Sequence, residues 1–166
     1  MSQTEPAQPN LLEQLLQIRD QQRAERKNGK WLVSGDDLDW EINQQGKMRW
    51  YMHPSIHDTA IRTLIVFVQE IPPGSRSGRQ KTPGGQIMFI LQGRGYTTVD
   101  GVRHYWQERD CVNIPTRRDG VIVQHFNESQ EEAVRFICVE PNLVDTLGVD
   151  RGSAFEQLEV APEYEE

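Results

Sequence analysis

The chain has 166 residues, of which 36% are hydrophobic and 26% are charged, a composition typical of one globular domain. Eighteen Lys and Arg residues against 25 Asp and Glu residues give a net charge of -7 at pH 7, which disfavours nucleic acid and anionic membranes as partners. The apolar runs are far shorter than the roughly 20 residues of a membrane span, and no apolar leader follows Met1, so we expect a cytoplasmic protein.

Residues 1–30 are expected to form a polar tail followed by a helical arm. Asn10 and Glu13 have the spacing of a capping box, and apolar residues then recur at helical spacing, which predicts a helix over 11–27. The sequence after Ile18 is charged, so only the first two turns have an apolar face. This face packs either on the flank of the domain or on a partner subunit.

Residues 31–142 are predicted to form an all-β domain. Short runs rich in Val, Ile, Thr and aromatic residues are separated by Gly, Pro, Asp and Asn, and no second long helical pattern occurs. This indicates an antiparallel sandwich or barrel, with a two-residue hairpin turn at Asp100-Gly101. The predicted strands cover residues 31–34, 38–42, 48–52, 61–71, 86–91, 96–99, 102–106, 110–114, 121–126 and 133–139.

Residues 143–166 are expected to be a short C-terminal extension. Residues 142–152 suggest a helical turn, whereas residues 156–166 contain five glutamates and no Lys or Arg, which favours a solvated, mobile tail. The two cysteines, Cys111 and Cys138, are too few for a disulfide framework and lack the spacing of a zinc site. We therefore expect both to be buried small side chains.

The segment from Gly74 to Gly93 resembles the first motif of the cupin superfamily. That motif is a glycine, five residues, His-x-His, three or four residues, Glu, six residues and a glycine. Both glycines align without a gap, but the two His positions hold Gln80 and Thr82, and the Glu position holds Gln86. The resemblance therefore implies a jelly-roll-like cupin barrel that has kept the frame of the motif and lost its ligands.

The second cupin motif is also degenerate. Arg109, Pro115 and Asn127 align with its glycine, proline and asparagine, and the His position, counted back from Asn127, holds Val123. Transition metals need three or more imidazole, carboxylate or thiolate donors, which amides, one hydroxyl and a valine do not supply. The sequence thus predicts no metal and no cofactor in this chain.

The remaining site candidates are one histidine and a group of basic residues. His125 lies two residues after Val123, so strand alternation places both on one face, where His125 is either a core residue or a weak catalytic candidate. Neither the His53–His57 pair, which a proline interrupts, nor His104 is expected to bind a metal. Side chains near the motif loops are solvated or can contact an anion or a partner; they are Arg76, Arg79, Arg117, Arg118 and Asn127.

A closer resemblance covers roughly residues 11–142 and is to the small subunit of hydroquinone 1,2-dioxygenase. The matching stretches are GKWLVSG (29–35), MRWYMHP (48–54), EIPPGSRSG (70–78), GRGYTTVDGVRHYW (93–106) and QHFN (124–127). The resemblance implies a heterotetramer of two small and two large subunits, with the ferrous iron in the larger cupin subunit. It implies that hydroquinone, an intermediate in aromatic and 4-nitrophenol-type degradation, is opened to 4-hydroxymuconic semialdehyde.

Two other functional classes remain open at this stage. One is a metal-independent cupin epimerase or isomerase in which His125 acts as general base. The other is a cupin that binds a small molecule without chemistry, for which no helix-turn-helix partner domain is recognisable in the sequence. In the dioxygenase hypothesis the isolated chain is inactive and stabilises the large catalytic subunit.

Overall fold

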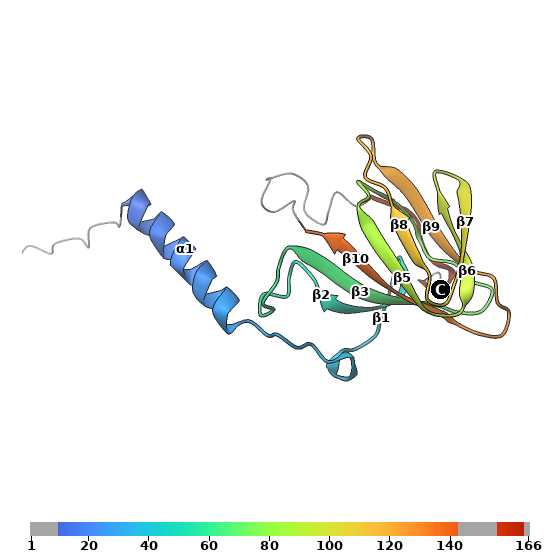
Figure 1. Cartoon of the computed structure of the whole chain (residues 1–166), viewed down its shortest axis with the longest axis horizontal. Coiled ribbons are helices and arrows are strands. Elements are labelled where there is room, and N and C mark those ends of the chain that lie inside the picture. Colours follow the sequence, from blue (N-terminus) through green and yellow to red (C-terminus); the bar gives the residue numbers. More distant parts are fainter. Residues whose placement is uncertain (1–9, 143–155, 165–166) are drawn as a thin grey trace, which may run out of the picture.

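The computed structural model describes residues 10–142 and 156–164, which form one helix and two facing antiparallel sheets (Figure 1). In the six-stranded sheet the order is β1 (Glu41–Asn43), β2 (Gly46–Met52), β3 (Leu64–Ile71), β10 (Val134–Pro141), β5 (Gln86–Gln92) and β8 (Cys111–Ile114). In the five-stranded sheet it is β11 (Glu156–Glu159), β4 (Arg79–Thr82), β9 (Val121–Asn127), β6 (Arg94–Val99) and β7 (Val102–Gln107). The all-β, jelly-roll-like prediction is confirmed.

The core fills the space between the sheets. Alternation along the strands points every second side chain inward, so Met88 and Ile90 of β5 meet Val134 and Phe136 of β10, all at most 1% exposed. A second cluster, around Met48, Ile65, Phe67 and Cys138, and a third, around Val99, Ile114, Val121 and Val123, extend this core toward the two ends of the barrel. Cys138 is buried as predicted, but Cys111 is exposed at the start of β8, so that expectation was wrong.

The predicted turns agree with the backbone. Asp100 and Gly101 both have positive φ, 50° and 84°, and they connect β6 to β7 with Val99 opposite Val102. Gly93, the last glycine of the first motif, has φ 86°, and a side chain there would meet Val134 Cγ2 at 2.9 Å. A glycine at this turn lets β5 continue into β6 without displacing the core.

The N-terminal arm forms the predicted helix, α1 (Leu11–Asn28), whose N-terminus is capped by the Asn10 side chain at 2.9 Å from Glu13 N. Packing on the flank of the domain was the first expectation, and it is wrong, because α1 has no buried residue and projects away from both sheets (Figure 1). Near its C-terminal end Glu25 forms an ion pair with Arg62 (3.0 Å), and just after the helix Lys30 forms one with Asp58 (2.6 Å). None of the described helices has the length and apolarity of a membrane span.

Three predicted strands at the start of the barrel are wrong or shifted. Residues 31–34 pair with no strand, and Trp31 and Leu32 are 89% and 82% exposed, because this segment lies outside both sheets and leads into a short 3-10 helix (Gly35–Asp37). The strand expected at 38–42 is restricted to β1, and the one expected at 61–71 begins only at Leu64. Before Leu64 the chain makes a local turn in which the Thr59 hydroxyl donates to the carbonyl of Ile61.

Two strands were not predicted, β4 and β11, and they pair with each other. The acidic tail was expected to be solvated, but residues 156–159 form an edge strand along β4. Ion pairs of Glu159 with Arg79 (2.8 Å) and of Glu156 with Lys81 (3.4 Å) explain why glutamates sit here, since β4 supplies the opposite charge. Residues 162–164 then form a 3-10 turn, and the helical turn predicted within 142–152 lies mostly outside the described residues.

Candidate functional site

The four degenerate metal-motif positions all lie in the barrel interior. Gln80 on β4 pairs directly with Val123 on β9, and Thr82 follows two residues later on the same face. Gln86, on the opposite sheet, is also buried, and all four side chains are at most 8% exposed. The structure therefore brings the motif positions into the interior, as the frame of the motif indicates.

The donors at these positions do not fit a ferrous ion. Gln80 and Gln86 offer neutral amides, Thr82 a hydroxyl and Val123 no lone pair, whereas such ions require imidazole, carboxylate or thiolate ligands. The Thr82 hydroxyl already accepts a hydrogen bond from Gly84 N at 3.3 Å. Within the described ranges, no three His, Cys, Asp or Glu side chains gather to hold a metal ion.

A partly buried carboxyl group, Glu140 near the end of β10, lies beside Gln86, one of the motif positions. The Gln86 amide donates a hydrogen bond to Glu140 Oε2, and Oε1 has no hydrogen-bond partner among the described residues. Burial raises the pKa of Glu140, while the hydrogen bond from Gln86 opposes that rise. Gln80 is 8% exposed, and its side-chain amide also lacks a partner within the described chain.

These groups open into a pocket of about 590 Å³, which we call the barrel pocket. Its wall is aromatic on one side, where Trp50 contacts Phe67 with ring centroids 5.1 Å apart and His53 edge-on at 5.0 Å. On the other side Gln69 donates to the Gln45 carbonyl at 2.5 Å. The lining residues are Ile42, Asn43, Gln44, Gln45, Met48, Trp50, His53, Pro54, Ile65, Phe67, Gln69, Gln80, Glu140, Gln157 and Tyr164.

His125 is buried in the core and does not line the barrel pocket. Its Nδ1 is 2.9 Å from the Thr97 hydroxyl, which accepts a hydrogen bond from Trp106 Nε1, also at 2.9 Å. The imidazole lies against Phe136 at 4.9 Å, and burial lowers its pKa to about 4. This geometry favours a core role for His125 over a catalytic base.

The basic residues flanking the motif loops do not converge on the barrel pocket, since none of them lines it. Arg79 pairs with Glu159 of the C-terminal segment, and Arg117 lies 3.5 Å from Asp100 in the hairpin. Arg76 and Arg118 are exposed, and Arg76 forms an isolated backbone bridge to Phe126. Two of the four thus have intramolecular acidic partners in place of an anionic ligand.

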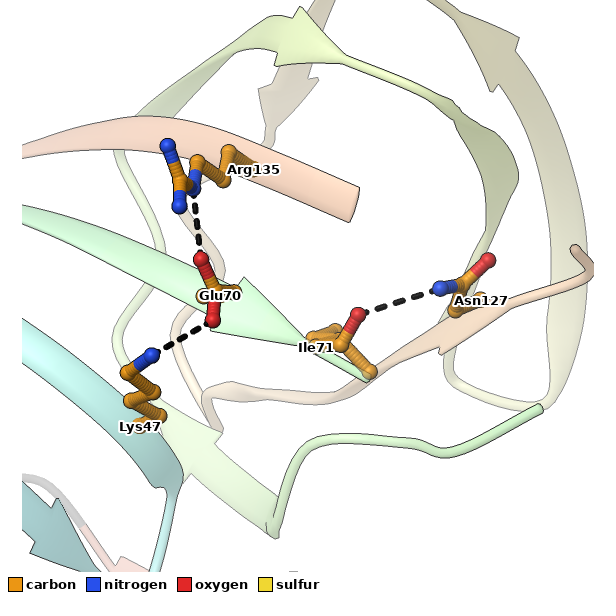
Figure 2. Close-up of polar contacts among 5 residues, drawn as sticks. All are labelled: Lys47, Glu70, Ile71, Asn127 and Arg135. Atoms are coloured by element: carbon orange, nitrogen blue, oxygen red, sulfur yellow. Dashed lines mark hydrogen bonds and ion pairs between the residues drawn. The ribbon is translucent and has the colours of Figure 1, made fainter. Parts of the chain in front are cut away.

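Asn127 is the buried last residue of β9, and its side chain is hydrogen-bonded to several backbone groups. Its Nδ2 lies 3.0 Å from the carbonyls of Ile71 and Pro72 and 2.8 Å from that of Glu132, and Figure 2 shows the bond to Ile71. Its Oδ1 accepts a hydrogen bond from Ser129 N at 2.9 Å. Asn127 is 5% exposed and does not line the barrel pocket.

A charged cluster covers the outer face of the six-stranded sheet. Glu70 accepts hydrogen bonds from Lys47 at 2.7 Å and Arg135 at 2.5 Å, from the two strands that flank β3 (Figure 2). Burial alone would raise the pKa of Glu70, but the two cationic donors outweigh it and lower that pKa. The cationic groups of Lys47 and Arg49 lie over the Trp40 ring, at 4.8 and 4.4 Å from its centroid, which adds cation–π contacts to the cluster.

Comparison with protein families agrees with this architecture. Residues 67–140, which run from β3 to β10, match the model of the cupin domain. This stretch, which is less than half of the chain, is similar to a cupin domain. No curated protein matches the chain.

Solved cupin structures share the fold at low sequence identity. A cupin-like protein from Thermotoga maritima is 20% identical, with a TM-score of 0.51 over 80% of this chain and 86% of that one. A polyketide cyclase from Streptomyces resistomycificus is 13% identical, with a TM-score of 0.58 over 80% and 88%. A cupin barrel protein from Salinispora arenicola is 19% identical, with a TM-score of 0.53 over 73% and 98%.

Several residues that line the barrel pocket were not predicted from the sequence, namely Trp50, Gln69 and Glu140. One signal existed for Glu140, because Phe136 and Cys138 share its strand face and both are buried. Because Glu140 follows these two buried residues at every-second-residue spacing, its carboxylate is expected to face the interior as well. His53 was considered only as a metal ligand with His57, but it lines the pocket while its Nδ1 contacts the Ser55 hydroxyl at 2.7 Å.

Proposed function

We propose that this chain is the non-metal cupin subunit of a two-component ferrous dioxygenase that cleaves the ring of hydroquinone. The observation that carries the proposal is a preserved cupin interior whose four motif positions hold Gln80, Thr82, Gln86 and Val123. A subunit that no longer binds iron keeps its barrel when a ligand-complete partner supplies the metal. The sequence stretches that resemble the small subunit of this enzyme support the same assignment.

The exposed arm gives the proposed subunit a way to hold its partner. Leu11, Leu12, Leu15 and Ile18 are 55–81% exposed on one stripe of α1, and no described part of the chain covers them. Isolated helices gain little stability in water, so an 18-residue helix with this stripe requires an apolar surface. In this proposal that surface belongs to the larger cupin subunit of a two-plus-two heterotetramer.

In this proposal the two subunits have different roles, because only the larger one has a complete set of metal ligands. Iron in the larger subunit supplies the activation of dioxygen and of the hydroquinone ring. This chain contributes a rigid barrel, an arm and the acidic outer surface that a net charge of -7 gives it. Its isolated form is expected to be inactive, because its interior has no set of three metal donors among the described residues.

Co-expression with a ligand-complete larger cupin subunit tests the proposal. The expected result is a complex with two copies of each chain, an iron content that matches the larger subunit alone, and ring cleavage only by the complex. Mass, metal content and the appearance of the semialdehyde product are the three measurements. An isolated chain that holds stoichiometric iron and cleaves hydroquinone would overturn the assignment of roles, as would a larger subunit that never binds this chain.

A further inference from the structure

We propose that the barrel pocket binds a small, uncharged aromatic molecule that carries a hydroxyl group. The inference goes beyond the proposed function, because assembly with a larger subunit does not require a ligand in this chain. It stands on three properties of the pocket: polar groups without partners in the described chain, an aromatic wall, and a lining whose described residues include no Lys or Arg.

Two polar groups face the barrel pocket without partners in the described chain. They are the side-chain amide of Gln80, which is 8% exposed, and Oε1 of Glu140. Neither group is fully shielded from water, so a ligand hydroxyl would replace water as the hydrogen-bond partner of each. A ligand hydroxyl can accept from the Gln80 amide and donate to Glu140 Oε1, because a hydroxyl is both donor and acceptor.

The opposite wall suits a flat ring. Trp50 and Phe67 pack with centroids 5.1 Å apart, and His53 meets Trp50 edge-on. Aliphatic groups of Met48 and Ile65 complete this side of the pocket. Aromatic side chains favour offset or edge-on contacts with other rings, and a volume of about 590 Å³ lies in the range of small-molecule sites.

The charge of the lining selects an uncharged ligand. Among the described residues of the lining there is no Lys or Arg, so none of these side chains neutralises a carboxylate or a phosphate. An organic cation would meet a single acidic side chain among the described lining residues, Glu140, which already accepts a hydrogen bond from Gln86 and whose charged form burial disfavours. A neutral aromatic ring that carries a hydroxyl group is therefore the class of ligand that fits both the polar and the aromatic side of the pocket.

Calorimetric titration of the full-length chain at pH 7 tests the inference with three probes of the same shape. The probes are 2-naphthol (neutral), 2-naphthoate (anionic) and 2-naphthylmethylammonium (cationic). We expect 2-naphthol to bind at least about tenfold more tightly than either charged probe. Equal affinity for the three probes, or no detectable 2-naphthol binding, would overturn the inference.

Two variants locate the site. Gln80→Leu removes the unpartnered amide and Trp50→Ala removes part of the aromatic wall, and each is expected to weaken 2-naphthol binding about tenfold or more. Gln92→Leu, an exposed glutamine at the end of β5 outside the pocket lining, is the matched control and leaves the affinity unchanged. Thermal melting establishes that each variant is folded, and an unchanged affinity in both folded pocket variants would contradict the assigned site.

Failure of this inference and failure of the proposed function are distinguishable. Gln80→Leu changes no residue of α1, so we expect it to associate with the larger subunit as the wild type does. A chain that binds 2-naphthol but never associates would keep the ligand site and remove the dioxygenase assignment. A chain that associates but binds none of the probes would keep the dioxygenase assignment and remove the ligand site.

Discussion

His125 shows how burial sets the chemistry of one residue. It is hydrogen-bonded to Thr97 in the core, and burial lowers its pKa from 6.5 to about 4. The folded protein therefore holds a neutral imidazole at pH values where the unfolded chain binds a proton. Because the folded-state pKa is depressed, the stabilising contribution is complete above pH 6.5 and is lost progressively as the pH falls toward 4.

This shift predicts a pH-dependent difference between two histidine variants. Between pH 7 and 5.5 the wild-type free energy of unfolding should fall by about 1 kcal/mol through His125. Urea unfolding of His125→Gln should lack this part of the decrease, although its stability at pH 7 is lower because the Thr97 contact changes. His104→Gln, at an exposed position on β7, serves as control and should retain the wild-type slope. Parallel slopes for all three proteins would contradict the assignment.

Arg109 is a second residue that affects stability, in this case through its backbone conformation. It occupies the glycine position of the second motif with φ 73°, and its N–H donates to the Ile90 carbonyl at 3.0 Å. A side chain in this left-handed region is strained, and the Arg109 side chain is 87% exposed, so little packing compensates.

Arg109→Gly should therefore raise the free energy of unfolding by about 0.5–1 kcal/mol, after the entropic cost of glycine is subtracted. Glu108→Gly, one residue earlier and without positive φ, should lower it by about the same amount. Thermal or urea unfolding measures both changes. The opposite signs are the test, and a loss of stability in both variants would show that the Arg109 side chain contributes more than its backbone strain costs.

At the scale of elements, strand prediction succeeded where side chains alternate between apolar and polar, and failed where the inward face is polar. β5 and β10 place Met88, Ile90 and Phe136 inward, and both strands were predicted. β4 instead buries Gln80 and Thr82, so its sequence carries no apolar alternation. β11 depends on pairing with β4, so the sequence of the tail alone could not indicate it.

The same limit applies to the candidate site. The motif frame predicted that positions 80, 82, 86 and 123 lie in the interior, because register and glycine spacing are local properties of the sequence. The barrel pocket joins Trp50 of β2 to Glu140 of β10 and Gln157 of β11, strands far apart in the chain. Such a convergence depends on the sheet order, which one sequence does not specify.

The arm gives a prediction about association. Leu15→Glu places a charge in the middle of the exposed stripe of α1, where Leu15 is 62% exposed. We expect the variant barrel to melt like the wild type, since α1 contributes no buried residue, and its affinity for the larger subunit to fall at least tenfold. Gln17→Glu adds the same charge to the opposite face of α1 and should bind normally. Equal binding by both variants in a pull-down titration would remove the arm from the interface.

β11 predicts a local effect on its neighbour. A chain that ends after residue 155 lacks β11, which exposes the edge of β4 to water and removes Gln157 and Tyr164 from the pocket wall. Hydrogen exchange of peptides that cover Arg79–Thr82 should become faster, while exchange in β3 and β10 stays slow. A chain that ends after Tyr164 is the control. Unchanged protection of β4 in the shorter chain would mean that the tail does not stabilise the sheet.

At the scale of the whole molecule, the four motif positions lie in the barrel interior but hold side chains that are poor ligands for a transition metal. Gln80 faces Val123 across β4 and β9, Thr82 follows on the same strand, and Gln86 comes from the opposite sheet. Donors from three strands that point into one interior are what a tetrahedral or octahedral ion requires. The fold can therefore be kept without a metal, and placing metal-ligating side chains at these four positions should restore metal binding.

The final prediction tests this separation directly. A variant with Gln80→His, Thr82→His, Gln86→Glu and Val123→His should bind one cobalt ion, measured by its visible absorption, whereas Gln80→His alone should not. The apo variant should be less stable than the wild type, because Val123 is fully buried and a histidine there introduces an unpaired polar group. Cobalt should then raise the melting temperature of the four-residue variant only. A folded variant that takes up no more cobalt than the single substitution would mean that the four positions no longer converge on one ion.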